Sequence, residues 1–175
     1  MTTTTTTTSL GSFRQGRWGI TTLGWAVRGA AAGAAGTTAL NAVTYLDMTV
    51  RGRGSSSTPE QTVEKLAEAA HVSIPGQGQV RENRLQGLGA LTGLAAGAGV
   101  GVLAGLARAT GLRLATPAGT ALTTVAVLVA ANGPMTVLGI TDPRTWSATD
   151  WLSDLVPHLA YALVVQTTME AFDRH

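Results

Sequence analysis

The chain contains no cysteine, one lysine and few charged residues of any kind. The missing cysteine excludes disulfide frameworks and every site that needs a thiolate, such as Cys-ligated zinc or iron–sulfur clusters. Charged residues make up 13% of the 175 residues, about half of the roughly 25% typical of soluble domains. The formal net charge of +2 is too small for the electrostatic footprint of a nucleic-acid-binding protein. We therefore expect no nucleic-acid partner.

The few charges are also segregated along the chain. Four stretches contain no Asp, Glu, Lys or Arg: residues 29–46, 85–107, 114–141 and 155–169. A helix crosses the hydrocarbon core of a bilayer with about 20 apolar residues, and neighbouring residues extend the first and last stretches to that length. The sequence therefore predicts an all-α fold, a four-helix transmembrane bundle with spans near 20–50, 85–108, 115–139 and 148–172.

The alternative is a soluble protein rich in Gly, Ala and Thr with long core helices. The mean hydropathy of only +0.21 is compatible with it. Such helices would carry charges on a solvent-facing side at helical spacing, and the two middle stretches carry none. The pattern favours the membrane interpretation, with the lipid bilayer as the partner and the plasma membrane as the location.

The N-terminal residues 1–17 include seven consecutive threonines and are predicted to be a disordered tail. Residues 18–175 would then form the membrane domain. Arg14 and Arg17 could belong to a signal peptide, but Arg28 interrupts the apolar stretch that should follow them. An uncleaved first span is therefore expected.

The orientation of the four spans is nearly balanced by charge. Six basic residues fall on each side of the membrane in the predicted topology. Arg108 and Arg113 lie in a short loop with no acidic neighbour in the sequence, whereas Arg144 is surrounded by aspartates. Because unopposed basic loops stay inside the cell, we expect cytoplasmic termini.

Residues 51–84 separate the first two spans and are predicted to be an extramembrane loop that contains a short amphipathic helix. Thr58 would cap this helix, Pro59 would suit its first position and Gln61 would complete a capping box. The helix would end near His71. We interpret it as a cap on the bundle, and the alternative is a helix that docks a partner.

Glycine recurs at every fourth residue of the second predicted span: Gly89, Gly93, Gly97, Gly101 and Gly105. Small residues at this spacing let helix backbones approach closely in lipid. Gly29 and Gly33 begin a similar stripe in the first span. The pattern predicts a glycine zipper between the first two spans, and the alternative is a self-associating oligomer or pore.

Antiparallel spans would place five polar residues in one half of the bundle: Asn41, Asp47, Asn132, Asp154 and His158. Asp154 and His158 lie one helical turn apart and can pair, and polar groups deep in a bilayer turn inward. The sequence thus predicts a small polar cavity with His158 as its titratable group. The alternative is that Asp47 pairs with Arg51, His158 is interfacial and the two asparagines hold helices together.

Two further local signals concern the last two spans. The Asn132-Gly133-Pro134 sequence is predicted to break the third span. Ser147 and Asp150 form a capping box that begins the fourth.

The tryptophans fit the two surfaces of a membrane. Trp146 and Trp151 are expected in one interfacial belt, and Trp18 and Trp25 in the opposite one.

The sequence contains no pattern typical of catalysis. The three histidines are scattered without metal-ligand spacing, and no Gly-x-Ser-x-Gly elbow is present. Glu170 and Asp173 are expected to be partnered by Arg174 or water. We therefore predict no catalytic residue, no metal and no cofactor, and do not expect an enzyme.

Five segments taken together resemble small multi-pass membrane proteins of actinobacteria: LNAVTYLD (40–47), STPE (57–60), NGPMT (132–136), DPRTW (142–146) and PHLAY (157–161). The region around His158 also resembles, more distantly, the YagU-like inner-membrane proteins. The resemblance implies a membrane location and no particular activity. The function expected from the sequence is a structural or accessory membrane component, with a homo-oligomer or another membrane protein as a partner. The alternative is a small transporter or channel-like protein that uses the polar cavity.

Overall fold

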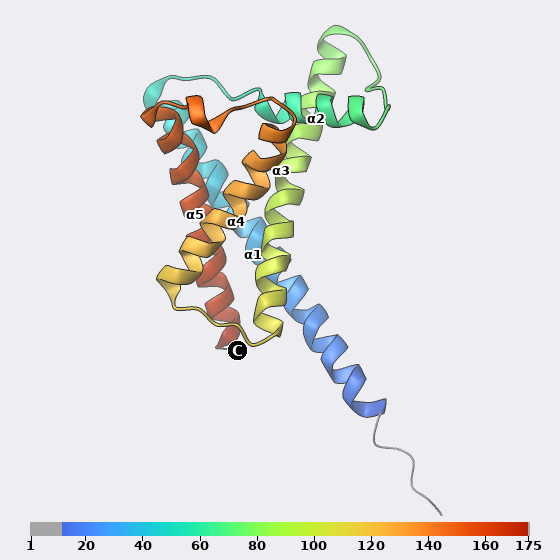
Figure 1. The fold of residues 1–175 in the computed structure, drawn as a ribbon, viewed down its shortest axis with the longest axis vertical. Coiled ribbons are helices and arrows are strands. Elements are labelled where there is room, and N and C mark those ends of the chain that lie inside the picture. Colours follow the sequence, from blue (N-terminus) through green and yellow to red (C-terminus); the bar gives the residue numbers. More distant parts are fainter. Residues whose placement is uncertain (1–11, 175) are drawn as a thin grey trace, which may run out of the picture.

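The computed structural model describes residues 12–174, and their side chains from Thr22 onward. Over this range the chain contains five α-helices, one short 3-10 helix and no strand (Figure 1). The helices are α1 (Ser12–Arg51), α2 (Thr58–Ala69), α3 (Gly78–Ala109), α4 (Thr116–Val137) and α5 (Ala148–Asp173), with the 3-10 helix η1 (Pro143–Thr145) before α5. The all-α class predicted from the sequence is confirmed.

The predicted N-terminal tail lies only partly within the described residues. Positions 1–11 fall outside them, and positions 12–17 are the first residues of α1. The side chain of Trp18 also falls outside the described part of the chain, as does His175.

Helices α3 and α4 are long and apolar enough to cross a membrane. Only 22% of the most apolar 18-residue window of each helix is buried inside the molecule, so most of their apolar surface faces outward. Helices α1 and α5, over their described residues, do not reach the same apolar character.

Helix α1 lies between α3 and α5 and contacts both, while α4 packs on α5. Figure 1 shows α1 crossing the other helices diagonally, with its N-terminal part extending beyond them. The core lies along one face of α5, where Tyr161, Val165 and Met169 are fully buried at intervals of one helical turn. A Cβ at Gly36 of α1 would lie 2.7 Å from the Tyr161 ring, so a small residue is needed there for α1 and α5 to meet.

Helix α2 lies across α3 at the end of the molecule away from the C-terminus (Figure 1). Its N-cap is Ser57 rather than Thr58, and no side chain caps it, so the predicted capping box is wrong. The Gln61 side chain instead donates to the Ser57 hydroxyl at 2.9 Å. The helix ends at Ala69, slightly before the predicted end, and His71 then adopts a positive φ of 56°.

Helix α4 continues through Pro134 to Val137, so the predicted break at this proline is wrong. Pro134 lacks an N–H and removes one backbone bond, but its own carbonyl accepts from the Leu138 amide at 2.9 Å. The chain turns away only at Gly139, which has a positive φ of 69°. The start of α5 is as predicted, because Ser147 and Asp150 form a complete capping box.

Candidate functional site

The closest approach between helices joins α1 and α3 through glycines that the sequence singled out. A Cβ at Gly33 would lie 3.0 Å from the Ala98 Cα, and one at Gly101 would lie 2.7 Å from the Gly33 Cα. A Cβ at Gly29 or at Gly105 would likewise lie 3.1 Å from the Cα of the other glycine. Because backbone meets backbone at this contact, no larger residue fits without moving a helix.

The five glycines of α3 do not share this environment. A Cβ at Gly97 would contact the Thr37 hydroxyl, so Gly97 still faces α1. Gly89 faces α2, where a Cβ would lie 3.0 Å from the Pro59 Cβ, whereas a Cβ at Gly93 would meet no atom within 4 Å. The α1 contact therefore ends near Gly97, because α1 crosses α3 diagonally rather than running along it (Figure 1).

Three of the five predicted cavity residues are in contact. The Asn132 amide donates to Asp154 Oδ2 at 2.8 Å, which links α4 to α5. His158 Nδ1 lies 2.6 Å from the Asp154 backbone carbonyl and 3.4 Å from its Oδ1. Since a carbonyl can only accept, Nδ1 carries a hydrogen, and Nε2 of the neutral ring is then an acceptor. His158 is only 8% exposed, so its ring is buried in the bundle beside Asp154.

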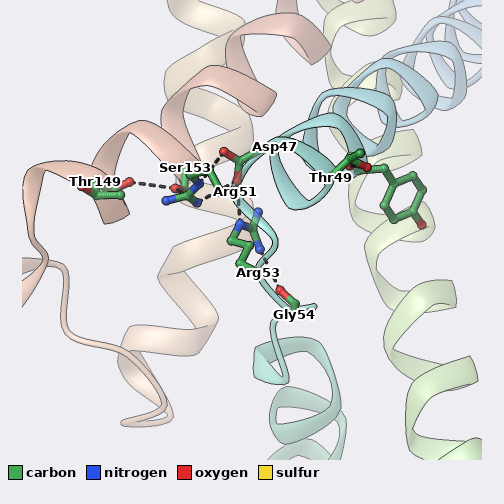
Figure 2. Close-up of polar contacts among 8 residues, drawn as sticks. Asp47, Thr49, Arg51, Arg53, Gly54, Thr149 and Ser153 are labelled. Atoms are coloured by element: carbon green, nitrogen blue, oxygen red, sulfur yellow. Dashed lines mark hydrogen bonds and ion pairs between the residues drawn. The ribbon is translucent and has the colours of Figure 1, made fainter.

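Asp47 belongs to a different group of residues, at the end of α1 (Figure 2). Its carboxylate pairs with Arg51 Nε at 2.7 Å and with Arg53 Nε at 2.6 Å. Arg51 also donates to the Ser153 hydroxyl of α5 at 2.7 Å, and that hydroxyl donates to the Thr149 carbonyl. The Asp47–Arg51 pair is the alternative that the sequence left open, and it ties the end of α1 to the first turns of α5.

Asn41 is partly buried in α1, and its side chain forms no hydrogen bond with any residue between 22 and 174. The five predicted residues thus separate into the Asn132–Asp154–His158 contact, the Asp47 ion pairs and Asn41. Two hollows lie around the α2–α3 connection, and none of these five residues lines either of them.

Sequence reasoning missed an ionic group at the opposite end of α5. Asp173 pairs with Arg108 of α3 and, at 3.1 Å, with Arg113 of the α3–α4 loop. Glu170 accepts from the Thr116 hydroxyl at 2.8 Å and from the Gln166 amide at 3.2 Å. Asp173 is therefore paired with two arginines that the sequence did not suggest, while the charge of Arg174 acts on Glu170 without an ion pair. The antiparallel order of the helices is the signal that could have found it, since it brings the α3–α4 loop to the C-terminal end of α5.

This group also removes the basis for the expected orientation. Arg108 and Arg113 have an acidic neighbour in space although they have none in sequence. Arg28 lies over the Trp25 ring at 5.1 Å and near the Phe172 ring at 5.9 Å. The end of the bundle that contains the C-terminus therefore combines the buried Arg108–Asp173 ion pair and the more exposed Arg113–Asp173 pair with cation–π contacts.

The α4–α5 loop contains a separate exposed ion pair. Asp142 accepts from the Arg144 guanidinium at 2.8 Å and from the Arg144 backbone amide at 3.0 Å. The guanidinium, followed by the amide, lowers the pKa of Asp142 below its usual value, and the same carboxylate raises the pKa of Arg144. Trp146 and Trp151 pack edge to face nearby, with ring centroids 5.0 Å apart.

The side chains between Thr22 and Arg174 include no group of three or more His, Asp or Glu that could hold a metal ion. Comparison of the chain with protein families, with curated proteins and with solved structures found no match. The arguments for its function therefore rest on its own geometry.

Proposed function

We propose that the protein is an integral membrane protein in which α1, α3, α4 and α5 cross the plasma membrane as a four-helix bundle, and that it serves as a structural or accessory component there. The observation that carries the proposal is the outward face of α3 and α4. Five large apolar side chains on it are between 55% and 64% exposed: Leu91, Leu103, Leu122, Val125 and Val129. Large apolar side chains exposed along two neighbouring helices are typical of surfaces that contact a membrane or a partner protein.

The placement of the charges supports the same conclusion. The ion pairs of Asp173 lie where α3 and α5 end, next to the α3–α4 loop. Those of Asp47 and Asp142 lie at the other end, where α1 ends and before α5 begins. The middle of the bundle would then match the hydrocarbon core, and its two charged ends would match the headgroup layers.

The weaker apolar character of α1 has a structural reason under this proposal. One side of α1 contacts α3 through Gly29 and Gly33, and another contacts α5 through Gly36. Glycine and alanine add little hydropathy, yet they are what close helix packing in lipid requires. Helix α5 keeps an exposed apolar face at Val156, which is 47% exposed, and at Leu163, which is 45% exposed.

The absence of cysteine allows a direct experiment on topology. Single cysteines at Ser55, Thr110, Thr145 and Arg174, all exposed, are labelled with a membrane-impermeant maleimide in sealed vesicles. Four spans place Thr110 and Arg174 on one side, and Ser55 and Thr145 on the other. If only α3 and α4 cross, Arg174 is labelled together with Ser55 and Thr145. Recovery of the folded, untagged chain in the supernatant of a detergent-free lysate contradicts the membrane location altogether.

A second candidate function is that of a small transporter or channel-like protein. The observation that favours it is the contact of Asn132 with Asp154 beside the buried His158, because polar side chains that meet between membrane spans can line a path for protons or a small solute. Proton flux into liposomes that contain the purified protein, abolished by His158→Ala and retained in the exposed-histidine control His71→Ala, would favour this candidate. Flux at the level of empty liposomes would favour the structural role.

A further inference from the structure

A hollow of about 480 Å³ lies between the α2–α3 connection and the first turns of α3. Its apolar lining includes Val72, Ile74, Pro75, Leu88 and Leu91, and Arg84 is the one charged side chain that reaches it. We call it the α2–α3 hollow. Leu91 and Val72 are each 62% exposed, so a large apolar surface is open on one side.

The guanidinium of Arg84 has N–H groups that form no hydrogen bond with residues 22–174. Its Nη1 donates to the Pro75 carbonyl at 2.6 Å, which holds the side chain against the connection. No carboxylate between residues 22 and 174 forms an ion pair with it, whereas Arg81, one turn earlier, pairs with Glu64 at 2.6 Å. An exposed guanidinium with unused N–H groups suits the oxygens of a phosphate.

The position of Arg84 along α3 indicates the level at which the hollow would lie in a bilayer. Arg84 immediately precedes the uncharged residues 85–107 of α3. Leu88 and Leu91 lie about 6 Å and about 10 Å further along the helix, at about 1.5 Å per residue. Where α3 crosses a bilayer, Arg84 is therefore level with the headgroups and the two leucines are level with the acyl chains.

We propose that the α2–α3 hollow binds an anionic phospholipid, whose phosphate contacts Arg84 and whose acyl chain lies along Leu88 and Leu91. This inference rests on the proposed membrane location. Charge decides the class of lipid: a negatively charged headgroup leaves the Arg84 charge compensated, and a zwitterionic one brings its own cation to the same place. The apolar lining decides that the ligand is a lipid rather than free phosphate.

Binding is measured by native mass spectrometry of the purified full-length chain in detergent micelles, titrated with dioleoylphosphatidylglycerol or dioleoylphosphatidylcholine. We expect the anionic lipid to bind about fivefold more tightly, from about 1 kcal/mol per arginine near the membrane surface. Arg84→Gln abolishes this preference and Arg84→Lys retains part of it. Equal binding of the two lipids to the unmodified chain, or an unchanged preference in Arg84→Gln, overturns the proposal.

A second pair of variants examines the hollow itself. Gly87 lines it and has no atom within 4 Å of a methyl built on it, so Gly87→Leu fills the hollow without a clash at Cβ. Gly93 is equally open on the same helix and does not line the hollow, which makes Gly93→Leu the matched control. We expect Gly87→Leu to weaken binding of both lipids and Gly93→Leu to leave it unchanged. Equal effects of the two variants, or displacement of the lipid by inorganic phosphate, contradict the proposed site.

The cysteine-labelling pattern separates the two proposals. If labelling gives the four-span pattern and the lipid preference is absent, the lipid site is wrong and the proposed function stands. If the untagged chain stays in the supernatant of a detergent-free lysate, both are wrong.

Discussion

At the scale of single residues, identical glycines differ in what surrounds them. Gly101 lies against the backbone of α1, where a Cβ would come within 2.7 Å of the Gly33 Cα, while a Cβ at Gly93 would meet nothing within 4 Å. Both glycines belong to the same four-residue repeat of α3. The cost of a side chain is therefore set by the neighbouring helix and not by the repeat.

We predict that Gly101→Ala destabilises the protein by about 1–3 kcal/mol, the range for overpacking a tight contact. Gly93→Ala should be neutral or stabilising, because alanine favours a helix by up to about 1 kcal/mol over glycine. Thermal unfolding of both variants in the same detergent measures the difference. Equal melting temperatures would show that α1 and α3 do not meet at Gly101.

The Asp142–Arg144 ion pair predicts a pH effect in the α4–α5 loop. The guanidinium lowers the pKa of Asp142 in the folded chain, so the stabilisation is complete above the usual carboxyl pKa and is lost as the pH falls through the lowered value. Tryptophan fluorescence, recorded from neutral to strongly acidic pH, should show a transition in the unmodified chain that Asp142→Asn lacks. Superimposable profiles would exclude this pair as the cause.

At the scale of helices and loops, local sequence signals decide where helices begin and end, but not always with the expected residue. The Ser147 hydroxyl accepts from the Asp150 amide at 3.2 Å, and Asp150 accepts from the Ser147 amide at 2.9 Å. In α2 the hydroxyl of the N-cap Ser57 is occupied by the Gln61 side chain and caps no backbone group. Similar sequence patterns thus give a complete cap in one helix and none in the other.

Ser147→Ala should therefore destabilise the protein by about 1 kcal/mol, the usual cost of losing an N-cap. Ser57→Ala is the control, and we expect a smaller loss because no backbone amide depends on its side chain. Denaturant or thermal unfolding of both variants gives the comparison. A larger loss in Ser57→Ala would contradict the assignment of the two caps.

At the scale of the whole molecule, the end of α5 is held by an ion-pair group that joins three parts of the chain. Arg108 is 7% exposed and its partner Asp173 is 18% exposed at the side chain. Arg113 of the α3–α4 loop pairs with the same carboxylate. Removing the acid would leave a buried guanidinium with only the more distant charge of Glu170 to compensate it, which is costly wherever water is scarce.

We predict that Asp173→Asn destabilises the bundle by about 3 kcal/mol, the lower end for breaking a buried ion pair. Asp142→Asn, which breaks a pair whose Arg144 side chain is 89% exposed, should cost little near neutral pH. Unfolding of both variants at that pH measures the contrast. Comparable losses would indicate that Asp173 is solvated rather than buried against α3.

The positions of the long helices could be predicted from the amino-acid sequence, because they depend on local quantities: uncharged length, capping residues and glycine at helix ends. The predicted spans near 115–139 and 148–172 coincide closely with α4 and α5 for this reason. Local patterns failed at Pro134, where a single missing N–H cost less than ending the helix.

The contacts between residues on different helices emerged only from the packing of the bundle. It brought Asn132 to Asp154 but left Asn41 apart, joined Arg51 of α1 to Ser153 of α5, and placed Asp173 between Arg108 and Arg113. These pairings depend on the angle at which α1 crosses α3 and on the face that each helix turns to its neighbours. Both follow from packing between surfaces distant in sequence, and no spacing along one helix specifies them.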